Sequence, residues 1–235
     1  MKCHATLIVL LTLFLVANIT AADKPARKPE LRTAKDVEVK YHVALPKGWN
    51  ADGTWPILVT LAGAGRDHQQ NFDQFVAVRG DKLPFIVVTP CVNSLGRDPA
   101  DLKAVLAIAK EVQTEFHGQP KFYVTGFSAG AHLTWQLIFL HPDALAGAVP
   151  VCGNFNARGI DHIEPNAAAE KLPIHGVQGD KDQVIHHLNP QWDSAVELLG
   201  KHGYKNISRN VIPGGTHLPY PKEVVTFFAG LLPKP

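Results

Sequence analysis

The sequence predicts an α/β protein with a single domain, built on a mostly parallel central sheet with helices on both faces. Three observations lead to this fold class. Strand-like and helix-like segments alternate along the chain, which is the pattern of a parallel sheet covered by helices. The length of 235 residues suits one domain with a sizeable core. A glycine-flanked serine also stands between a predicted strand and a predicted helix, where a sharp turn is needed.

The first residues are expected to lie outside this domain. Residues 1–22 have the form of a signal peptide, with Lys2 as the basic start, an apolar run over 7–17 and small residues before position 23. That run is too short to span a membrane comfortably, so we expect a secreted or periplasmic protein without a stable membrane anchor. Residues 23–36 are rich in Lys, Arg and Pro and predict a flexible leader, which places the domain at 37–235.

The first half of the domain predicts three strands and one helix. Residues 37–45 alternate in the manner of an antiparallel strand and are followed by Pro46. Residues 56–61 and 85–89 are β-branched, apolar runs that indicate buried strands. Residues 99–116 have helical periodicity, with Asp98 as N-cap and Pro99 at the first helical position.

The second half continues the alternation. Further strands are expected at 121–125, 145–151, 172–177 and 207–212. Helices are expected at 131–140, 192–202 and 222–232, the second of them closed by a glycine.

The segment Gly126-Phe127-Ser128-Ala129-Gly130 fits the pattern G-x-S-x-G, with a predicted strand before it and a predicted helix after it. This is the context of a nucleophile elbow, in which a strained turn exposes the serine and side chains at the flanking positions would collide with neighbouring elements. The alternative is an ordinary Gly/Ser turn, since the pattern is common by chance. The flanking strand and helix favour Ser128 as a nucleophile.

A serine nucleophile on such a sheet is followed in the chain by an acid and then by a histidine. Asp182 follows the strand at 172–177 and precedes the apolar Val184, so it is expected to be partly buried, as a carboxylate that orients a histidine should be. Asp180 is the rival acid and could instead cap the turn. His217 lies in a loop with glycines and prolines after the last strand and is the candidate base, although loop histidines are more often surface residues.

The remaining site groups are backbone donors. An oxyanion hole needs two N–H groups, and we expect them from Ala129, directly after the serine, and from Ala64, in the small-residue loop after the strand at 56–61. That loop could equally be a glycine turn with no other role. No Rossmann helix and no ribose-binding acid are predicted after it, so a nucleotide site is not expected. His186 and His187 have no carboxylate or cysteine at a ligand spacing, so neither a metal nor a cofactor is expected.

With these motifs the chain resembles the α/β-hydrolase superfamily over residues 37–232. It looks most similar to small secreted esterases of the polyhydroxybutyrate-depolymerase and feruloyl or acetyl-xylan esterase kind, with dienelactone-hydrolase relatives nearby. The motifs that carry the resemblance are those at 61–65, 126–130, 179–182 and 215–217. Members usually have His-Gly where this chain has Ala62-Gly63, and dienelactone hydrolases use cysteine where this chain has Ser128.

In the implied fold, Cys91 and Cys152 end strands that lie three positions apart, about 14 Å at ~4.8 Å per strand, which is beyond disulfide reach. We therefore expect two free thiols that serve as ordinary small apolar packing. The 23 basic and 21 acidic residues give a net charge of +2 without a basic stripe, so nucleic acid is not an expected partner.

The resemblance implies a secreted serine hydrolase that cleaves carboxylic esters through an acyl-enzyme. Residues 153–171 are too few for a cap domain, so the site should be open, which suits small esters or esters linked to a polysaccharide or polyester. Phe155, Trp192 and Tyr220 could line it, although such aromatics more often pack in the core. A serine peptidase of the prolyl-oligopeptidase type and a non-catalytic binding protein of the same fold remain alternatives, and the oligomeric state stays open.

Overall fold

The computed structural model describes residues 27–65, 67–92, 98–157, 160, 163 and 166–233. The predicted signal peptide, residues 1–22, lies outside these ranges. Within them, no helix combines the length and the apolar character needed to cross a bilayer.

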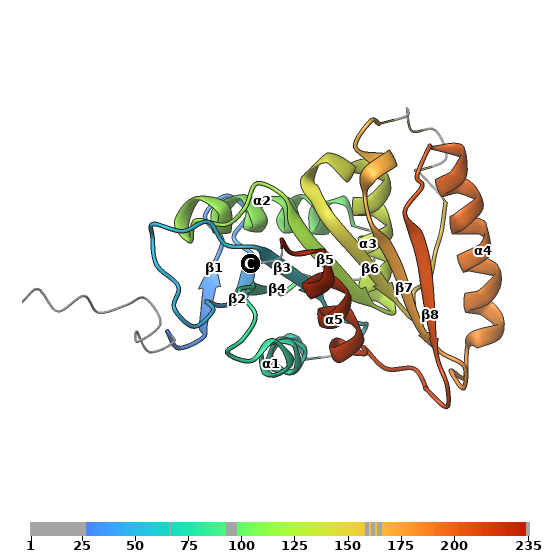
Figure 1. The fold of residues 1–235 in the computed structure, drawn as a ribbon, viewed down its shortest axis with the longest axis horizontal. Coiled ribbons are helices and arrows are strands. Elements are labelled where there is room, and N and C mark those ends of the chain that lie inside the picture. The colour runs from blue at the N-terminus through green and yellow to red at the C-terminus, as the bar shows by residue number, and fades with distance from the viewer. Residues whose placement is uncertain are drawn as a thin grey trace, which may run out of the picture.

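A mixed sheet of eight strands forms the centre of the molecule, in the order β1-β2-β4-β3-β5-β6-β7-β8 (Figure 1). The strand β2 is antiparallel to both of its neighbours, and all other pairs are parallel. The sheet confirms the predicted fold class. The strands are β1 (Glu30–Thr33), β2 (Lys40–Ala44), β3 (Ile57–Leu61), β4 (Ile86–Pro90), β5 (Phe122–Phe127), β6 (Leu145–Val151), β7 (Ile174–Gly179) and β8 (Ile207–Ile212).

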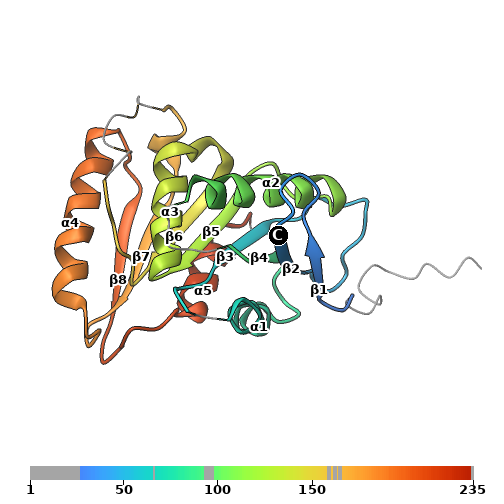
Figure 2. The ribbon, with the colours of Figure 1, turned by 180° about the vertical axis from the view of Figure 1, so that it is seen from behind.

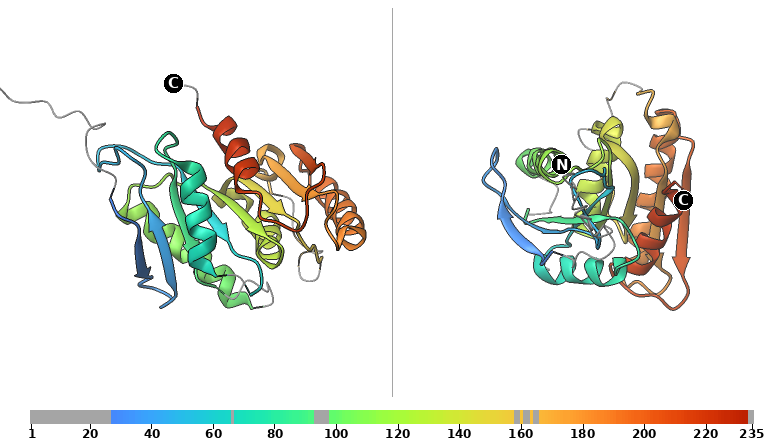
Figure 3. Two further views of the ribbon diagram at one scale, coloured as in Figure 1. Left: turned by 90° about the horizontal axis from the view of Figure 1, so that it is seen from below. Right: turned by 60° about the vertical axis from the view of Figure 1, so that its left-hand side comes forward.

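Helices cover both faces of this sheet. In Figures 1 and 2, α1 and α5 lie together on one side, and α2 and α3 lie on the other side. The two further views show the same layers from below and from one end (Figure 3). The helices are α1 (His68–Arg79), α2 (Pro99–Glu115), α3 (Ala129–Leu140), α4 (Ile185–Lys201) and α5 (Pro221–Leu231), with short 3₁₀ turns η2 (Pro142–Ala144) and η3 (Ala169–Lys171).

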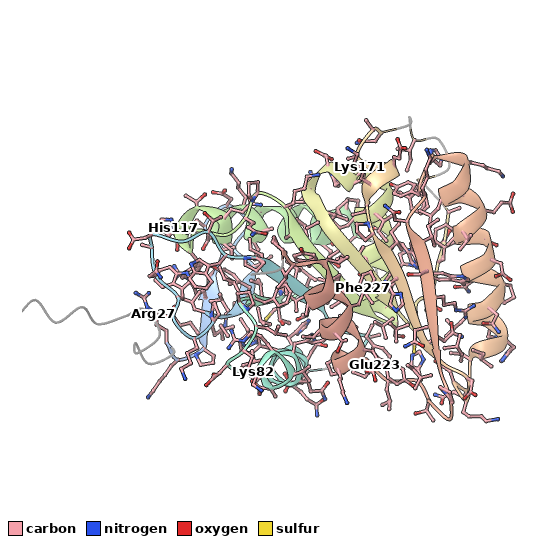
Figure 4. All side chains as sticks on the ribbon, in the orientation of Figure 1. Arg27, Lys82, His117, Lys171, Glu223 and Phe227 are labelled. Carbon is pink, nitrogen blue, oxygen red and sulfur yellow. The ribbon has the colours of Figure 1, made fainter. Side chains whose placement is uncertain are left out.

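Each face of the sheet has its own hydrophobic core, because side chains alternate along a strand. In β3, Ile57 and Val59 pack into the core under α2, α3 and α4, whereas Leu58 packs into the core under α1 and α5. Phe227 of α5, which Figure 4 labels, stacks on His175 of β7, and their ring centroids are 4.5 Å apart. The central strands are therefore buried on both sides, as their continuous apolar runs predicted.

The prediction of a flexible leader over residues 23–36 is wrong for its second half, which contains a strand. Residues 30–33 form the edge strand β1, which pairs with β2 in a hairpin. Arg32 donates to Glu115 of α2 at 2.6 Å, and Tyr41 donates to Glu111 at 2.7 Å. The basic residues that suggested a leader thus hold the hairpin against a helix.

The helix α1 was not predicted, and its sequence explains why. Two of its four buried residues are polar, so the apolar period is broken. Asn71 donates to Thr60 Oγ1 at 3.2 Å, and Arg79 donates to the carbonyl oxygens of Ala44 and Phe85 at 3.3 and 3.1 Å. The buried polar side chains are therefore satisfied by strands β2 and β3 and by the residue before β4.

The helix α4 begins at Ile185, seven residues before the predicted start at Trp192. Pro190 lies inside it, and a proline removes one backbone donor and normally ends a helical pattern. The predicted N-cap is confirmed, since Asp98 accepts from Ala100 N at 2.8 Å. Cys91 and Cys152 are both free thiols, as expected.

The parallel strands β3, β5, β6, β7 and β8 end at one edge of the sheet. The loops that follow them therefore meet there, including those that carry Ser128, Asp182 and His217. Ligand sites of open α/β sheets lie at this carboxyl edge.

Candidate active site

Ser128 lies in the sharp turn between β5 and α3. Its backbone has φ 53° and ψ −110°, an uncommon conformation for a residue with a side chain. Ser128 N donates to Val151 O at 2.9 Å, which ties the turn to the end of β6. The structure therefore has the strained strand-turn-helix geometry that the sequence pattern predicted.

The two glycines of the pattern are required by close packing. A Cβ at Gly126 would lie 2.1 Å from Gly130 O, and a Cβ at Gly130 would lie 2.5 Å from Leu61 O. Neither position has room for a side chain. The second contact also shows that the end of β3 lies directly against the first turn of α3.

Ala129 is the first residue of α3. The first N–H groups of a helix have no acceptor within the helix, and they form its positive end. A backbone donor at Ala129 thus lies directly after the serine, where the sequence analysis expects the first oxyanion donor, and that role stays a prediction.

The acid turn follows β7 and places Asp182 in the interior. Its side chain has 0% exposure, and both oxygens are used. Oδ1 accepts from Val184 N at 3.0 Å, and Oδ2 accepts from Nδ1 of His217 at 2.6 Å. Asp180 is exposed and accepts instead from Gly214 N at 2.7 Å. The structure therefore brings Asp182 to the histidine and leaves Asp180 as a support of the histidine loop.

The loop that carries His217 is packed tightly against the acid turn. Lys181 N donates to Gly215 O at 2.8 Å, and a Cβ at Gly179 would lie 2.2 Å from that same oxygen. Tyr220, in a left-handed conformation with φ 46°, donates its hydroxyl to Thr216 O at 2.6 Å. Burial raises the pKa of this tyrosine, so it stays a donor. These contacts fix the backbone on both sides of His217.

The imidazole of His217 also contacts the serine turn. Its ring centroid lies 4.7 Å from that of Phe127, the residue before Ser128. The His217 side chain keeps 21% exposure, so the ring faces solvent on one side and the buried carboxylate on the other. A base in this position can accept a proton at the carboxyl edge of the sheet.

Cys152 is the site residue that the sequence analysis treated only as packing. It follows β6, is 1% exposed and has φ 44°. Its Sγ lies 3.6 Å from Leu218 O, and the three side chains of Cys152, Asp182 and His217 have ligand atoms within 4.8 Å of one another. Burial, with the nearby Asp182, raises the pKa of the thiol to about 12. The one signal in the sequence was its place at the end of the strand next to the elbow strand.

The loop after β3 also reaches the elbow. A Cβ at Gly63 would lie 2.7 Å from Cδ1 of Phe127, so the loop needs a glycine there. Ala64 follows and is exposed at the same edge. Its role as the second oxyanion donor stays a prediction.

The aromatic residues considered as site lining divide between core and support. Phe155 is 8% exposed and packs edge-on against Trp135 with centroids 5.5 Å apart. Trp192 covers Gly176, where a Cβ would lie 2.3 Å from its ring. Phe155 belongs to the core and Trp192 is partly buried against it, whereas Tyr220 supports the histidine loop.

No family model matches the chain, and no curated protein matches its sequence. Solved structures do match its fold. A fluorophosphonate-binding serine hydrolase of Staphylococcus aureus matches with a TM-score of 0.69 at 14% identity, over 90% of this chain and 100% of that one. The feruloyl esterase module of Clostridium thermocellum, complexed with sinapinate, gives 0.65 at 16% identity over 92% and 91%. A thermostable esterase gives 0.64 at 21% identity over 86% of this chain and 60% of its own length.

Proposed function

We propose, from the α/β-hydrolase fold that this chain has, that it is a serine hydrolase that cleaves carboxylic esters through an acyl-enzyme. One observation carries the proposal: the buried carboxylate of Asp182 accepts from Nδ1 of His217 at 2.6 Å, beside a strained turn that presents Ser128. An acid, a base and a strained serine at one sheet edge are the parts of a catalytic triad.

The direction of the hydrogen bond between His217 and Asp182 determines which ring nitrogen can take a proton. With Nδ1–H donated to Asp182, the imidazole carries its free lone pair on Nε2, which is the atom that takes the proton of Ser128 as the hydroxyl oxygen attacks an ester carbonyl. Asp182 stabilises the imidazolium that results. His217 then gives the proton to the leaving alcohol, and a water activated by the same histidine releases the acid.

The oxyanion of the tetrahedral intermediate is held by backbone groups. Ala129 supplies the N–H at the start of α3, and we assign the second donor to Ala64 because its loop lies against both Phe127 and the first turn of α3. No step of this chemistry calls for a metal or a cofactor.

The finer parts of the proposal concern substrate and location. The predicted signal peptide supports a secreted or periplasmic protein. The segment 153–171 that follows β6 is too short for a cap domain, which supports an open site for small esters or for esters on a polysaccharide or polyester. The esterases among the structures of similar fold support ester hydrolysis, without bearing on the alcohol part of the substrate.

A panel of ester substrates, run with and without a fluorophosphonate, tests the proposal. We expect hydrolysis of activated esters and complete loss of activity after labelling. Matched ester and amide substrates with the same acyl group separate an esterase from a peptidase of the prolyl-oligopeptidase type. Absence of both hydrolysis and labelling would instead favour a non-catalytic binding protein.

A further inference from the structure

The thiol of Cys152 stands next to the acid-base pair without a part in the proposed reaction. Its Sγ, a carboxylate oxygen of Asp182 and a ring nitrogen of His217 all lie within 4.8 Å of one another. These atoms are one sulfur, one oxygen and one nitrogen, and each is a type that binds zinc in proteins. The three side chains come from three different loops of the carboxyl edge, so only the fold brings them together.

We propose that Cys152, Asp182 and His217 form a binding site for a thiophilic divalent cation of the zinc class, and that its occupancy inhibits the enzyme. The inhibition rests on the proposed function, whereas the binding does not. The site is distinct from a catalytic metal centre, because the proposed reaction proceeds without it.

Two hydrogen bonds must open before such an ion can bind, the one between Asp182 Oδ2 and His217 Nδ1 and the one from Cys152 Sγ to Leu218 O. Ligand bonds of about 2.0 to 2.3 Å in a tetrahedral site place the ligand atoms roughly 3.5 Å apart. The atoms of the three side chains already lie within 4.8 Å, and the closest pair, Asp182 Oδ2 and His217 Nδ1, is 2.6 Å apart. A modest outward movement of the imidazole would open the space, and a water would complete the coordination.

Binding changes the protons in a defined way. Bonds form from the cation to sulfur, to a carboxylate oxygen and to Nδ1, while the S–H bond of Cys152 breaks and its proton leaves to solvent. The proton on Nδ1 moves to Nε2. The imidazole then has no lone pair left on Nε2, so it can no longer accept the proton of Ser128.

The surroundings select the class of cation. One of the three donors is a sulfur atom, so the ion must bind sulfur strongly enough to displace the S–H proton. Zinc and cadmium meet this condition, whereas magnesium and calcium prefer sets of oxygen ligands. Of the three side chains, His217 is the one that solvent reaches, at 21% exposure. We therefore expect slow onset of inhibition, because the ring must move before the ion enters.

Cadmium titration of the full-length chain tests the binding directly, through the ultraviolet charge-transfer absorption of a cadmium-thiolate bond. The chain has three cysteines, so Cys3→Ser and Cys91→Ser serve as matched controls for Cys152→Ser. We expect one thiolate-bound cadmium in the parent protein and in both controls, and none in Cys152→Ser. Circular dichroism confirms that each variant is folded, and Cys152→Ala gives a second variant at the same position.

Inhibition is tested by measuring ester hydrolysis by the same proteins with and without zinc. The rate of each variant is compared with its own rate in the absence of metal. We expect zinc to inhibit slowly, EDTA to reverse the inhibition, and magnesium to have no effect. In Cys152→Ser we expect the inhibition constant for zinc to rise by at least roughly 10- to 100-fold, because even changes outside the ligand set weaken metal binding by that factor. Equal cadmium absorption with and without Cys152 would overturn the site. Absorption that depends on Cys152 while hydrolysis continues would keep the metal site and overturn the assigned roles of Asp182 and His217.

Discussion

The ring of His217 lies 4.7 Å, centroid to centroid, from the ring of Phe127, the residue immediately before Ser128. Phe127 also closes the space over Gly63, where a Cβ would lie 2.7 Å from the ring. One aromatic side chain therefore contacts both the loop of the base and the loop expected to donate to the oxyanion. This arrangement links the three loops through packing around the residue that precedes the serine.

Replacing the nucleophile should remove the reaction and keep the fold. In Ser128→Ala we expect kcat for an activated ester to fall by on the order of 10⁶, the scale seen when a serine hydrolase loses its nucleophile. The substitution deletes one oxygen from a half-buried residue, so the thermal midpoint should stay close to that of the parent protein. Steady-state kinetics and a fluorophosphonate label followed by peptide mapping check this. A label on another serine would contradict the assignment.

The two aspartates of the acid turn should differ in effect. Asp182→Asn should lower kcat by roughly 10⁴-fold, because the amide favours the wrong imidazole tautomer. Asp180→Asn is the matched control, since an asparagine can still accept from Gly214 N and the residue is exposed. We expect a small change there. A larger loss for Asp180→Asn than for Asp182→Asn would move the role of the acid to Asp180.

The sequence was sufficient for the sheet and for the elbow because both rest on local patterns. Apolar runs marked the buried strands, and the glycines of the elbow reflect backbone contacts at 2.1 and 2.5 Å that exclude any side chain. It also placed Ser128, Asp182 and His217 in loops that meet at one edge of the sheet, whereas their catalytic roles stay predictions. It also favoured Asp182 over Asp180, because the apolar Val184 that follows predicted burial, and Asp182 is the carboxylate that turns inward.

The features that the sequence missed depend on contacts between distant segments. The helix α1 was not predicted from the sequence because Asn71 and Arg79 are buried polar residues. Their hydrogen-bond partners lie on β3, at the end of β2 and just before β4. Likewise, Cys152 looked like simple packing because its neighbours Asp182 and Leu218 are remote in the chain. Only the sheet order, which places the ends of β6 and β7 side by side, brings the thiol to the acid-base pair.

The elbow glycines provide a test of stability. In Gly126→Ala the new Cβ would lie 2.1 Å from a backbone oxygen and 2.5 Å from Thr134 Oγ1, so the turn must shift. Overpacking of this kind costs about 1 to 3 kcal/mol or more in the free energy of unfolding. Gly200→Ala is the control, because that glycine lies in α4 with nothing within 4 Å of an added Cβ, and alanine should stabilise the helix by about 0.5 to 1 kcal/mol. Urea unfolding of both variants measures the two changes, and equal midpoints would show that the elbow is not tightly packed.

The last prediction concerns access to the serine. A lipase shows a jump in rate when its substrate forms an emulsion, because a mobile lid opens at the lipid surface. The segment 153–171 follows β6 directly, and its described residues Phe155, Ile160 and Ala169 are buried in the core. Phe155 N also donates to Gln191 of α4 at 2.8 Å. Moving this segment as a lid would expose those side chains to water, at about 25 cal/mol for each Å² of apolar surface.

We therefore expect the rate on a sparingly soluble long-chain ester to rise smoothly with concentration and to show no step at the solubility limit. Short-chain and bulky aromatic esters should both be accepted, since an open site places no wall over the acyl group. Rates measured across the onset of turbidity test whether a segment covers Ser128. A short-chain soluble ester serves as the control. A sharp increase at turbidity would show that a segment covers Ser128 in solution, and the proposal of polymer-borne esters would give way to that of a lipase.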